Sequence, residues 1–121
     1  MNYSLAQLKS LANKDPKELL LIMKSPGVTS RTLSLCVEQL GEEDLDEEMV
    51  LPIFKSLLRH INSAVRESAI IGISLFYSKK SPPQDILDKL IAMSESDSSN
   101  EIKECAQLTI RDFEKLNERN C

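Results

Sequence analysis

Turn-forming and aromatic residues are scarce in this sequence. Its 121 residues include only 3 Gly and 5 Pro, no Trp, 2 Tyr and 3 Phe. An all-β sandwich needs more turn glycines and more aromatic and β-branched side chains than these. The composition therefore favours an all-α fold before any periodicity is considered. Hydrophobic residues make up 41% of the chain, so one domain of this length can bury a core without disulfides or metal.

Residues that carry catalytic or metal-binding chemistry are equally few. His60 is the only histidine, and a lone histidine without a positioned partner makes neither a zinc site nor a general base. The three cysteines, Cys36, Cys105 and Cys121, include no CxxC pair, and neither internal one has a histidine close by in the sequence. The sequence also lacks a glycine-rich phosphate loop. We therefore expect no enzyme activity, no cofactor and no bound metal.

Targeting and membrane signals are missing as well. The first residues lack a basic stretch followed by an apolar one, so we expect no signal peptide. No apolar run approaches the roughly 18 residues that a membrane span needs. An odd number of cysteines, two of them inside helical patterns, indicates reduced thiols. The net charge of −4 opposes binding to a phosphate backbone. These features predict a cytoplasmic protein whose main partner is neither a membrane nor a nucleic acid.

Helix start signals, by contrast, are abundant. Ser4 and Gln7 form an S-x-x-Q capping box, and residues 15–18 (DPKE) supply an N-cap, a first-turn proline and a glutamate. Residues 81–84 (SPPQ) repeat this device, Ser98 and Glu101 form another box, and Gly41 stands where a C′ glycine would end a helix. With the apolar periodicity, these signals predict seven helices, at residues 4–13, 16–24, 29–40, 47–60, 63–79, 82–96 and 99–117.

The apolar run at residues 69–76 admits a second interpretation, as a buried strand. Periodicity alone does not separate a short buried strand from a buried helix. However, Val65, Ala69, Ile73 and Phe76 lie at i, i+4, i+8 and i+11, and the segment is too long for a strand. We therefore predict a helix that is buried over most of its circumference.

The second half of the chain aligns with itself without gaps when it is shifted by 37 residues. Residues 50–54 then fall on 87–91, and residues 65–69 (VRESA) fall on 102–106 (IKECA). A weaker copy precedes them, in which residues 29–33 fall on 65–69 at a shift of 36. A period of this length with two helices per unit is typical of helical repeat proteins.

These segments resemble the HEAT-repeat family, whose second helices open with V-R-x-x-A and continue with apolar residues four and seven positions later. The matching residues are Val65, Arg66, Ala69, Ile73 and Phe76 in one unit, and Ile102, Lys103, Ala106, Ile110 and Phe113 in the next. The resemblance implies a single domain, residues 1–121, built as an α-α superhelix of about three stacked antiparallel helix pairs. Its repeats would span residues 15–41, 46–79 and 82–117, and residues 1–14 would form an N-terminal capping helix.

The same family commonly carries an aspartate in the turn between paired helices, where it forms a ladder with the arginine of the second helix. Asp97 fits that position in the last unit, whereas Lys24 and His60 occupy it in the others. The resemblance therefore implies an incomplete ladder. Arg66 and Lys103 stand at equivalent repeat positions, so stacking would place them in one row, which is either structural or a binding surface.

Repeats of this kind act as interaction scaffolds, so our preferred hypothesis is a protein–protein interaction module, such as an adaptor, an inhibitor or an immunity-type partner. The surface of the second helices would bind another protein through Arg66, Ile70, Tyr77 and Lys103, because Arg and Tyr are enriched among binding hot spots. One alternative is a nucleic-acid-binding protein similar to HEAT-like base-repair proteins, and another is an accessory subunit of an enzyme. The acidic run at residues 42–48 either docks a basic partner or a cation, or stabilises the N-terminus of the next helix.

Overall fold

The computed structural model describes the backbone of residues 3–120 and the side chains of residues 3–116, so Cys121 lies outside the described residues. Within this range all regular structure is helical and no strand occurs. The predicted all-α fold is therefore confirmed, and the run at residues 69–76 belongs to a helix. The helices are α1 (Leu5–Lys14), α2 (Lys17–Lys24), α3 (Ser30–Glu42), α4 (Glu47–Leu57), α5 (Ser63–Phe76), α6 (Gln84–Ser96) and α7 (Asn100–Asn120).

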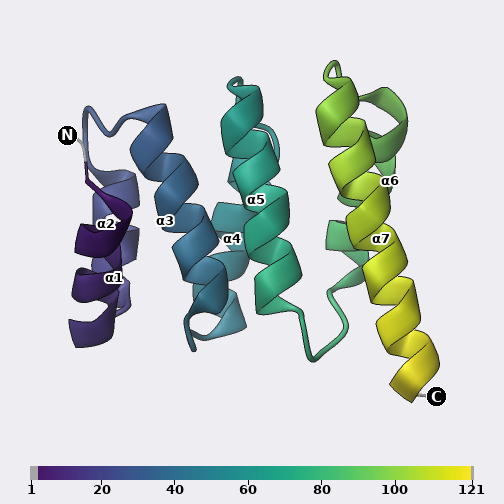
Figure 1. Ribbon diagram of the computed structural model, residues 1–121, viewed down its shortest axis with the longest axis horizontal. Coiled ribbons are helices and arrows are strands. Elements are labelled where there is room, and N and C mark those ends of the chain that lie inside the picture. The colour runs from purple at the N-terminus through teal and green to yellow at the C-terminus, as the bar shows by residue number, and fades with distance from the viewer. Residues whose placement is uncertain (1–2, 121) are drawn as a thin grey trace.

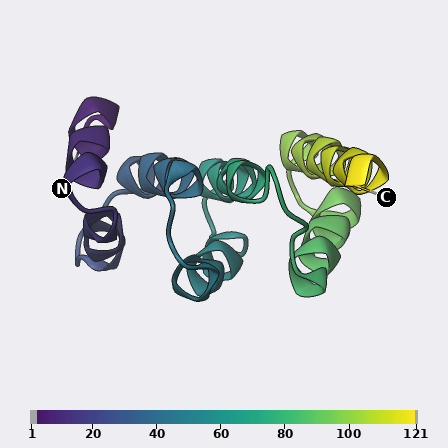
Figure 2. The same cartoon turned by 90° about the horizontal axis from the view of Figure 1, so that it is seen from below.

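The helices lie side by side along the long axis of the molecule (Figure 1). Seen from below, α1, α3, α5 and α7 form one layer, and α2, α4 and α6 form the other (Figure 2). Sequence neighbours pack across the layers, in the pairs α2–α3, α4–α5 and α6–α7. Within the first layer, α1 packs on α3, α3 on α5, and α5 on α7. We call the outer surface of α3, α5 and α7 the odd-helix face.

The predicted caps explain where several helices begin. In α1, the Ser4 hydroxyl accepts the Gln7 N–H while the Gln7 side chain accepts the Ser4 N–H, which confirms the capping box. The Asp15 carboxylate accepts the N–H of Lys17 at the start of α2. The prediction for α7 was wrong by one residue, because the hydroxyl that accepts the Ile102 N–H belongs to Ser99 rather than Ser98. The carboxylate of Asp97 accepts the N–H of the same Ser99 at 2.9 Å.

The repeat seen in the sequence recurs in the burial of the second helices. Val65 and Ala69 of α5 are buried, and so are their equivalents in α7, Ile102 and Ala106. The first helices follow a different shift, because the buried Val50 and Phe54 of α4 correspond in burial to Ile86 and Leu90 of α6. This spacing is one residue shorter than the shift of 37 that we predicted for residues 50–54. The equivalence of the two first helices therefore needs that correction.

The closest helix contact joins α3 and α5 through two glycines. A Cβ added to Gly41 would lie 2.3 Å from the Gly72 carbonyl oxygen, and one added to Gly72 would lie 2.5 Å from the Val37 carbonyl oxygen. The two backbones are therefore in direct contact. Our prediction that Gly41 ends a helix as a C′ residue was wrong, since α3 continues to Glu42 and Gly41 has no positive φ. Gly41 is required for close approach instead.

Candidate functional site

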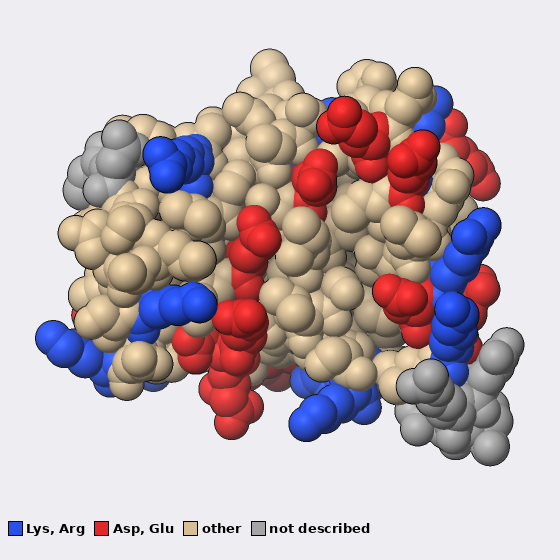
Figure 3. Space-filling view, in the orientation of Figure 1, with Lys and Arg blue, Asp and Glu red and all other residues tan. Residues whose placement is uncertain are grey.

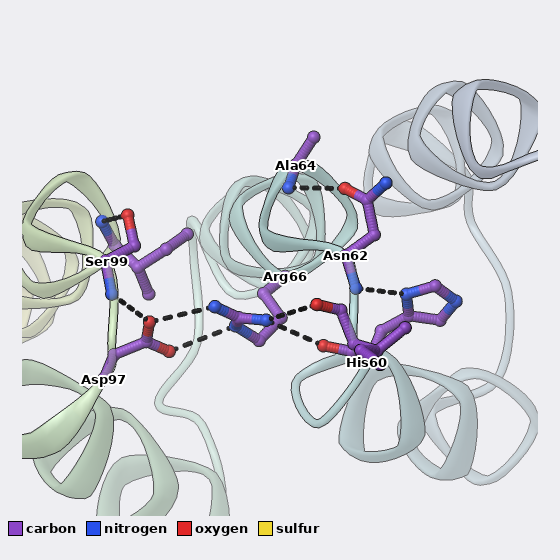
Figure 4. A network of polar contacts seen from close by, with 8 residues as sticks. His60, Asn62, Ala64, Arg66, Asp97 and Ser99 are labelled. Carbon is purple, nitrogen blue, oxygen red and sulfur yellow. Dashed lines mark hydrogen bonds and ion pairs between the residues drawn. The ribbon is translucent and has the colours of Figure 1, made fainter.

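Arg66 lies at the centre of a polar network that ties α5 to the turn between α6 and α7 (Figure 4). Its Nε and Nη2 donate to the two carboxylate oxygens of Asp97 at 3.1 and 3.0 Å. Its Nη1 donates to the backbone carbonyls of His60 and Ile61, at 2.9 and 3.1 Å. The Asp97 carboxylate also accepts the Ser99 N–H at 2.9 Å. The arginine therefore joins the turn between α4 and α5 to the turn between α6 and α7.

This ion pair is shielded from water. The side chains of Arg66 and Asp97 are 13% and 7% exposed. Burial by itself raises the pKa of the Asp97 carboxyl. The hydrogen bonds from Arg66 and the Ser99 N–H, with the charges of Arg66 and Lys103, outweigh that effect and lower the pKa. Asp97 consequently stays ionised, and the pair contributes to stability rather than offering a free charge.

The other members of the predicted row behave differently from Arg66. Lys103 stands at the equivalent position of α7, is partly exposed, and forms no ion pair within the part of the chain that is described. His60 accepts the Asn62 N–H through Nδ1 at 3.0 Å, so the lone histidine supports the turn. Of the predicted binding residues with a charge, only Lys103 remains available on the surface.

The two apolar anchors that we predicted are not on the surface. Ile70 and Tyr77 are both 0% exposed, so neither contacts a partner in the folded protein. Their repeat equivalents in α7, Gln107 and Glu114, are exposed and polar. The difference is what stacked repeats would produce, because a unit covered by its neighbour buries positions that an uncovered unit exposes. The assignment of Ile70 and Tyr77 to a binding site is therefore corrected, and both belong to the core.

A groove runs along the odd-helix face where α5 meets α7. Its upper part has a volume of about 430 Å³ and is lined by Glu67, Glu101, Glu104, Cys105, Leu108 and Thr109. A second hollow of about 290 Å³ continues it toward the C-terminal ends of both helices, lined by Ser74, Tyr77, Ser78, Asp112, Phe113, Lys115 and Leu116. The two hollows use successive turns of α7, so they follow one seam between the helices.

The sequence explains why this seam is open while the α3–α5 seam is closed. Gly41 and Gly72 let α3 and α5 touch. One repeat later the equivalent positions hold Tyr77, 36 residues after Gly41, and Thr109, 37 residues after Gly72. Both of these side chains line the hollows between α5 and α7. Larger side chains at the crossing point hold the helices apart, because interaxial distance depends on the residues at the contact.

Carboxylates dominate the groove and its surroundings. Figure 3 shows acidic side chains over the upper part of α7 and along the border of α3 and α5, while basic side chains lie mainly at the margins of this face. The sequence analysis did not identify Glu67 and Glu104 as site residues, although the 37-residue repeat aligns them. They occupy equivalent positions in residues 65–69 and 102–106, and the fold brings both to one groove.

Neither internal cysteine is poised for nucleophilic chemistry. Burial raises the pKa of the Cys36 thiol to about 11. For Cys105, burial and then the negative charge of Glu67 raise the pKa above its ordinary value. Both thiols are therefore protonated near neutral pH, and the thiolate is the reactive species. Cys105 lines the groove, which makes its thiol a natural reporter for whatever binds there.

The acidic run at residues 42–48 links α3 to α4. Glu47 and Glu48 lie in the first turn of α4, where negative charge stabilises the helix dipole. Asp46 precedes them as the N-cap residue of α4. Glu42, Glu43 and Asp44 border a shallow hollow of about 380 Å³ together with Lys79 and Lys80. Of these carboxylates, Glu43 also accepts a hydrogen bond from the Gln39 side chain at 3.1 Å.

The described residues include neither a candidate metal site nor a candidate membrane span. Within the described residues, no group of three or more His, Cys, Asp or Glu side chains is placed to hold a metal ion. None of the described helices is both long and apolar enough to cross a membrane. In comparisons with known proteins, no family model, no curated protein and no solved structure matches this chain.

Proposed function

We propose that this protein is a protein-binding module built as a short HEAT-like α-solenoid. The resemblance of residues 65–76 and 102–113 to HEAT second helices supports the architecture, as does the packing of α2–α3, α4–α5 and α6–α7 as successive pairs. Arg66 and Asp97 supply one rung of the ladder that the resemblance implies. Solenoids of this kind offer an extended surface for binding other proteins.

The exposed apolar side chains of the odd-helix face carry the proposal. Leu75 of α5 is 38% exposed and Leu108 of α7 is 59% exposed, and Leu108 lines the larger hollow of the groove. Apolar residues beside a groove and rimmed by polar residues are typical of protein interaction sites. The carboxylates around them oppose the nucleic-acid alternative, since a phosphate backbone needs a basic surface.

A capture experiment with surface variants tests this function. The tagged protein is used to capture partners from its cell of origin, in parallel with Leu75→Lys/Leu108→Lys on the odd-helix face. The control is Leu21→Lys/Ile91→Lys, which replaces leucine and isoleucine of α2 and α6 that are 62% and 41% exposed. We expect a partner that the parent and the control retain and that the odd-helix variant loses. Equal capture by all three proteins would place binding elsewhere.

A further inference from the structure

The α5–α7 groove has the dimensions of a site for one additional helix. Positions 67, 71 and 74 follow one stripe of α5, at i, i+4 and i+7, with Ser78 just after the helix, and positions 101, 105, 108 and 112 follow the matching stripe of α7. From Glu101 to Lys115 the seam is about 21 Å long at 1.5 Å per residue. A helix of about four turns covers that length, and side chains of one helix fit the groove between two others.

The upper hollow combines apolar and acidic side chains. Leu108 and Cys105 line it together with Glu67 of α5 and Glu101 and Glu104 of α7. The cation among the lining residues, Lys115, belongs to the lower hollow. An occupant therefore needs an apolar stripe for Leu108 and Cys105, and positive charge concentrated at the end that meets the three glutamates. A helix with apolar residues at i, i+3, i+4 and i+7 provides such a stripe.

We propose that the α5–α7 groove binds a basic amphipathic helix of a partner protein. This rests on the proposed function and names the chemistry of the partner. The apolar stripe of the partner packs on Leu108 and Cys105, and its lysines or arginines pair with Glu67, Glu101 and Glu104. Complementary charge sets the orientation of the bound helix and the rate of encounter, while the apolar contact gives the affinity.

Binding of a synthetic peptide tests the proposal on the full chain. The probe has about 15 residues, which form four helical turns, with leucine on one stripe and lysine elsewhere. One control peptide has the same composition in scrambled order, and another carries glutamate in place of lysine. Binding is measured by fluorescence anisotropy. In the Cys121→Ser background, the rate at which maleimide modifies Cys105 reports occupation of the groove, because Cys36 is buried.

Two matched charge variants locate the site. Glu101→Lys/Glu104→Lys alters the groove, and Glu42→Lys/Glu48→Lys makes the same change of net charge in the acidic segment at residues 42–48. We expect the groove variant to lose at least about tenfold in affinity and the segment variant to bind like the parent. If the charge reversals lower stability, as judged by circular dichroism, the corresponding Glu→Gln pairs replace them. Leu108→Ala should weaken binding, and Leu21→Ala should not.

The possible results separate this inference from the proposed function. Binding of the lysine peptide that protects Cys105 and depends on the groove glutamates supports the inference. Equal loss in both charge variants, equal binding of the scrambled peptide, or preference for the glutamate peptide overturns it. None of these results alters the capture experiment, in which dependence on Leu75 and Leu108 decides whether the odd-helix face binds a protein at all.

Discussion

At the scale of single residues, two glycines determine how closely α3 and α5 approach. A Cβ on Gly72 would lie 2.5 Å from the Val37 carbonyl oxygen and 3.2 Å from the Phe54 ring. Gly72→Ala gains up to about 1 kcal/mol in helix propensity. Overpacking against a rigid backbone costs about 1–3 kcal/mol, so we expect a net loss of stability in urea denaturation. The control is Ser10→Ala, at an exposed position of α1. Equal stability of the parent, Gly72→Ala and Ser10→Ala would contradict the close contact at the glycine.

The ion pair of Arg66 and Asp97 makes stability depend on pH. The folded pKa of Asp97 is lowered below the unfolded value of about 3.9. The carboxylate therefore stabilises the fold fully above that pH, and the stabilisation is lost as the pH falls through the lowered folded pKa. Asp97→Asn leaves the buried Arg66 charge unpaired, which should cost about 3 kcal/mol at pH 7.

Urea denaturation of the parent and of Asp97→Asn from pH 7 down to about pH 3 measures this difference. We expect the gap in unfolding free energy to narrow below the unfolded pKa of about 3.9, as Asp97 begins to bind a proton in the unfolded state. A gap that stays constant across this range would mean that the carboxylate charge is not the cause. Lys103→Gln is the matched control for the row of basic residues. Because Lys103 forms no ion pair with the residues described here, we expect a change within about 0.5 kcal/mol.

At the scale of helices, the last pair is joined to the others through few strong contacts. The α5–α7 seam contains the groove, whereas α3 and α5 meet backbone to backbone. Arg66 and Asp97 tie the α6–α7 turn to α5, and Lys55 of α4 pairs with Asp85 of α6 where both are more exposed. Regions with fewer buried contacts open at lower free energy than the global unfolding.

Native-state hydrogen exchange should therefore resolve α6 and α7 from the rest of the molecule. We expect their amides to exchange through a partial opening that leaves α3 and α5 protected, and Asp97→Asn to lower the free energy of that opening. Lys103→Gln should leave the exchange pattern unchanged. If all five helices from α3 to α7 exchange at one common free energy in both the parent and Asp97→Asn, the last pair is not a separate unit.

The helices were predictable because their signals are local. Capping residues such as Ser4 and Gln7 act within one turn, and apolar periodicity follows the chain. Gly41 was misinterpreted because a C′ glycine and a glycine at a helix crossing look alike until the partner, Gly72, is known. Ile70 and Tyr77 were placed on the surface because their burial depends on the following unit, which no local pattern encodes. The groove could have been predicted only by comparing Gly41 and Gly72 with Tyr77 and Thr109, their equivalents one repeat later. Such a comparison joins residues that are far apart in the sequence.

At the scale of the whole molecule, the ends of the row of helices differ from its middle. The middle helix α5 buries Ile70 and Tyr77, while α7 exposes Gln107 and Glu114 at the same repeat positions. A repeat array needs polar outer faces at its ends to remain soluble. Under the proposed solenoid architecture, we expect the polar residues of α7 to keep this exposed face from acting as a template for another copy.

Replacing the two polar residues of α7 with the residues found at the equivalent positions of α5 tests this role. Gln107→Ile/Glu114→Tyr gives α7 the residues that α5 uses at the equivalent positions, and thus places apolar side chains at two positions that are exposed among the described residues. Exposed apolar patches of this kind drive association, so we expect the sedimentation coefficient to rise with protein concentration relative to the parent. Lys9→Ile/Lys14→Tyr, at two exposed positions of α1, makes a similar gain in apolar surface away from that face. Self-association of both variants would reflect hydrophobicity alone, whereas association of the first variant only would show that the end of the array is specifically kept polar.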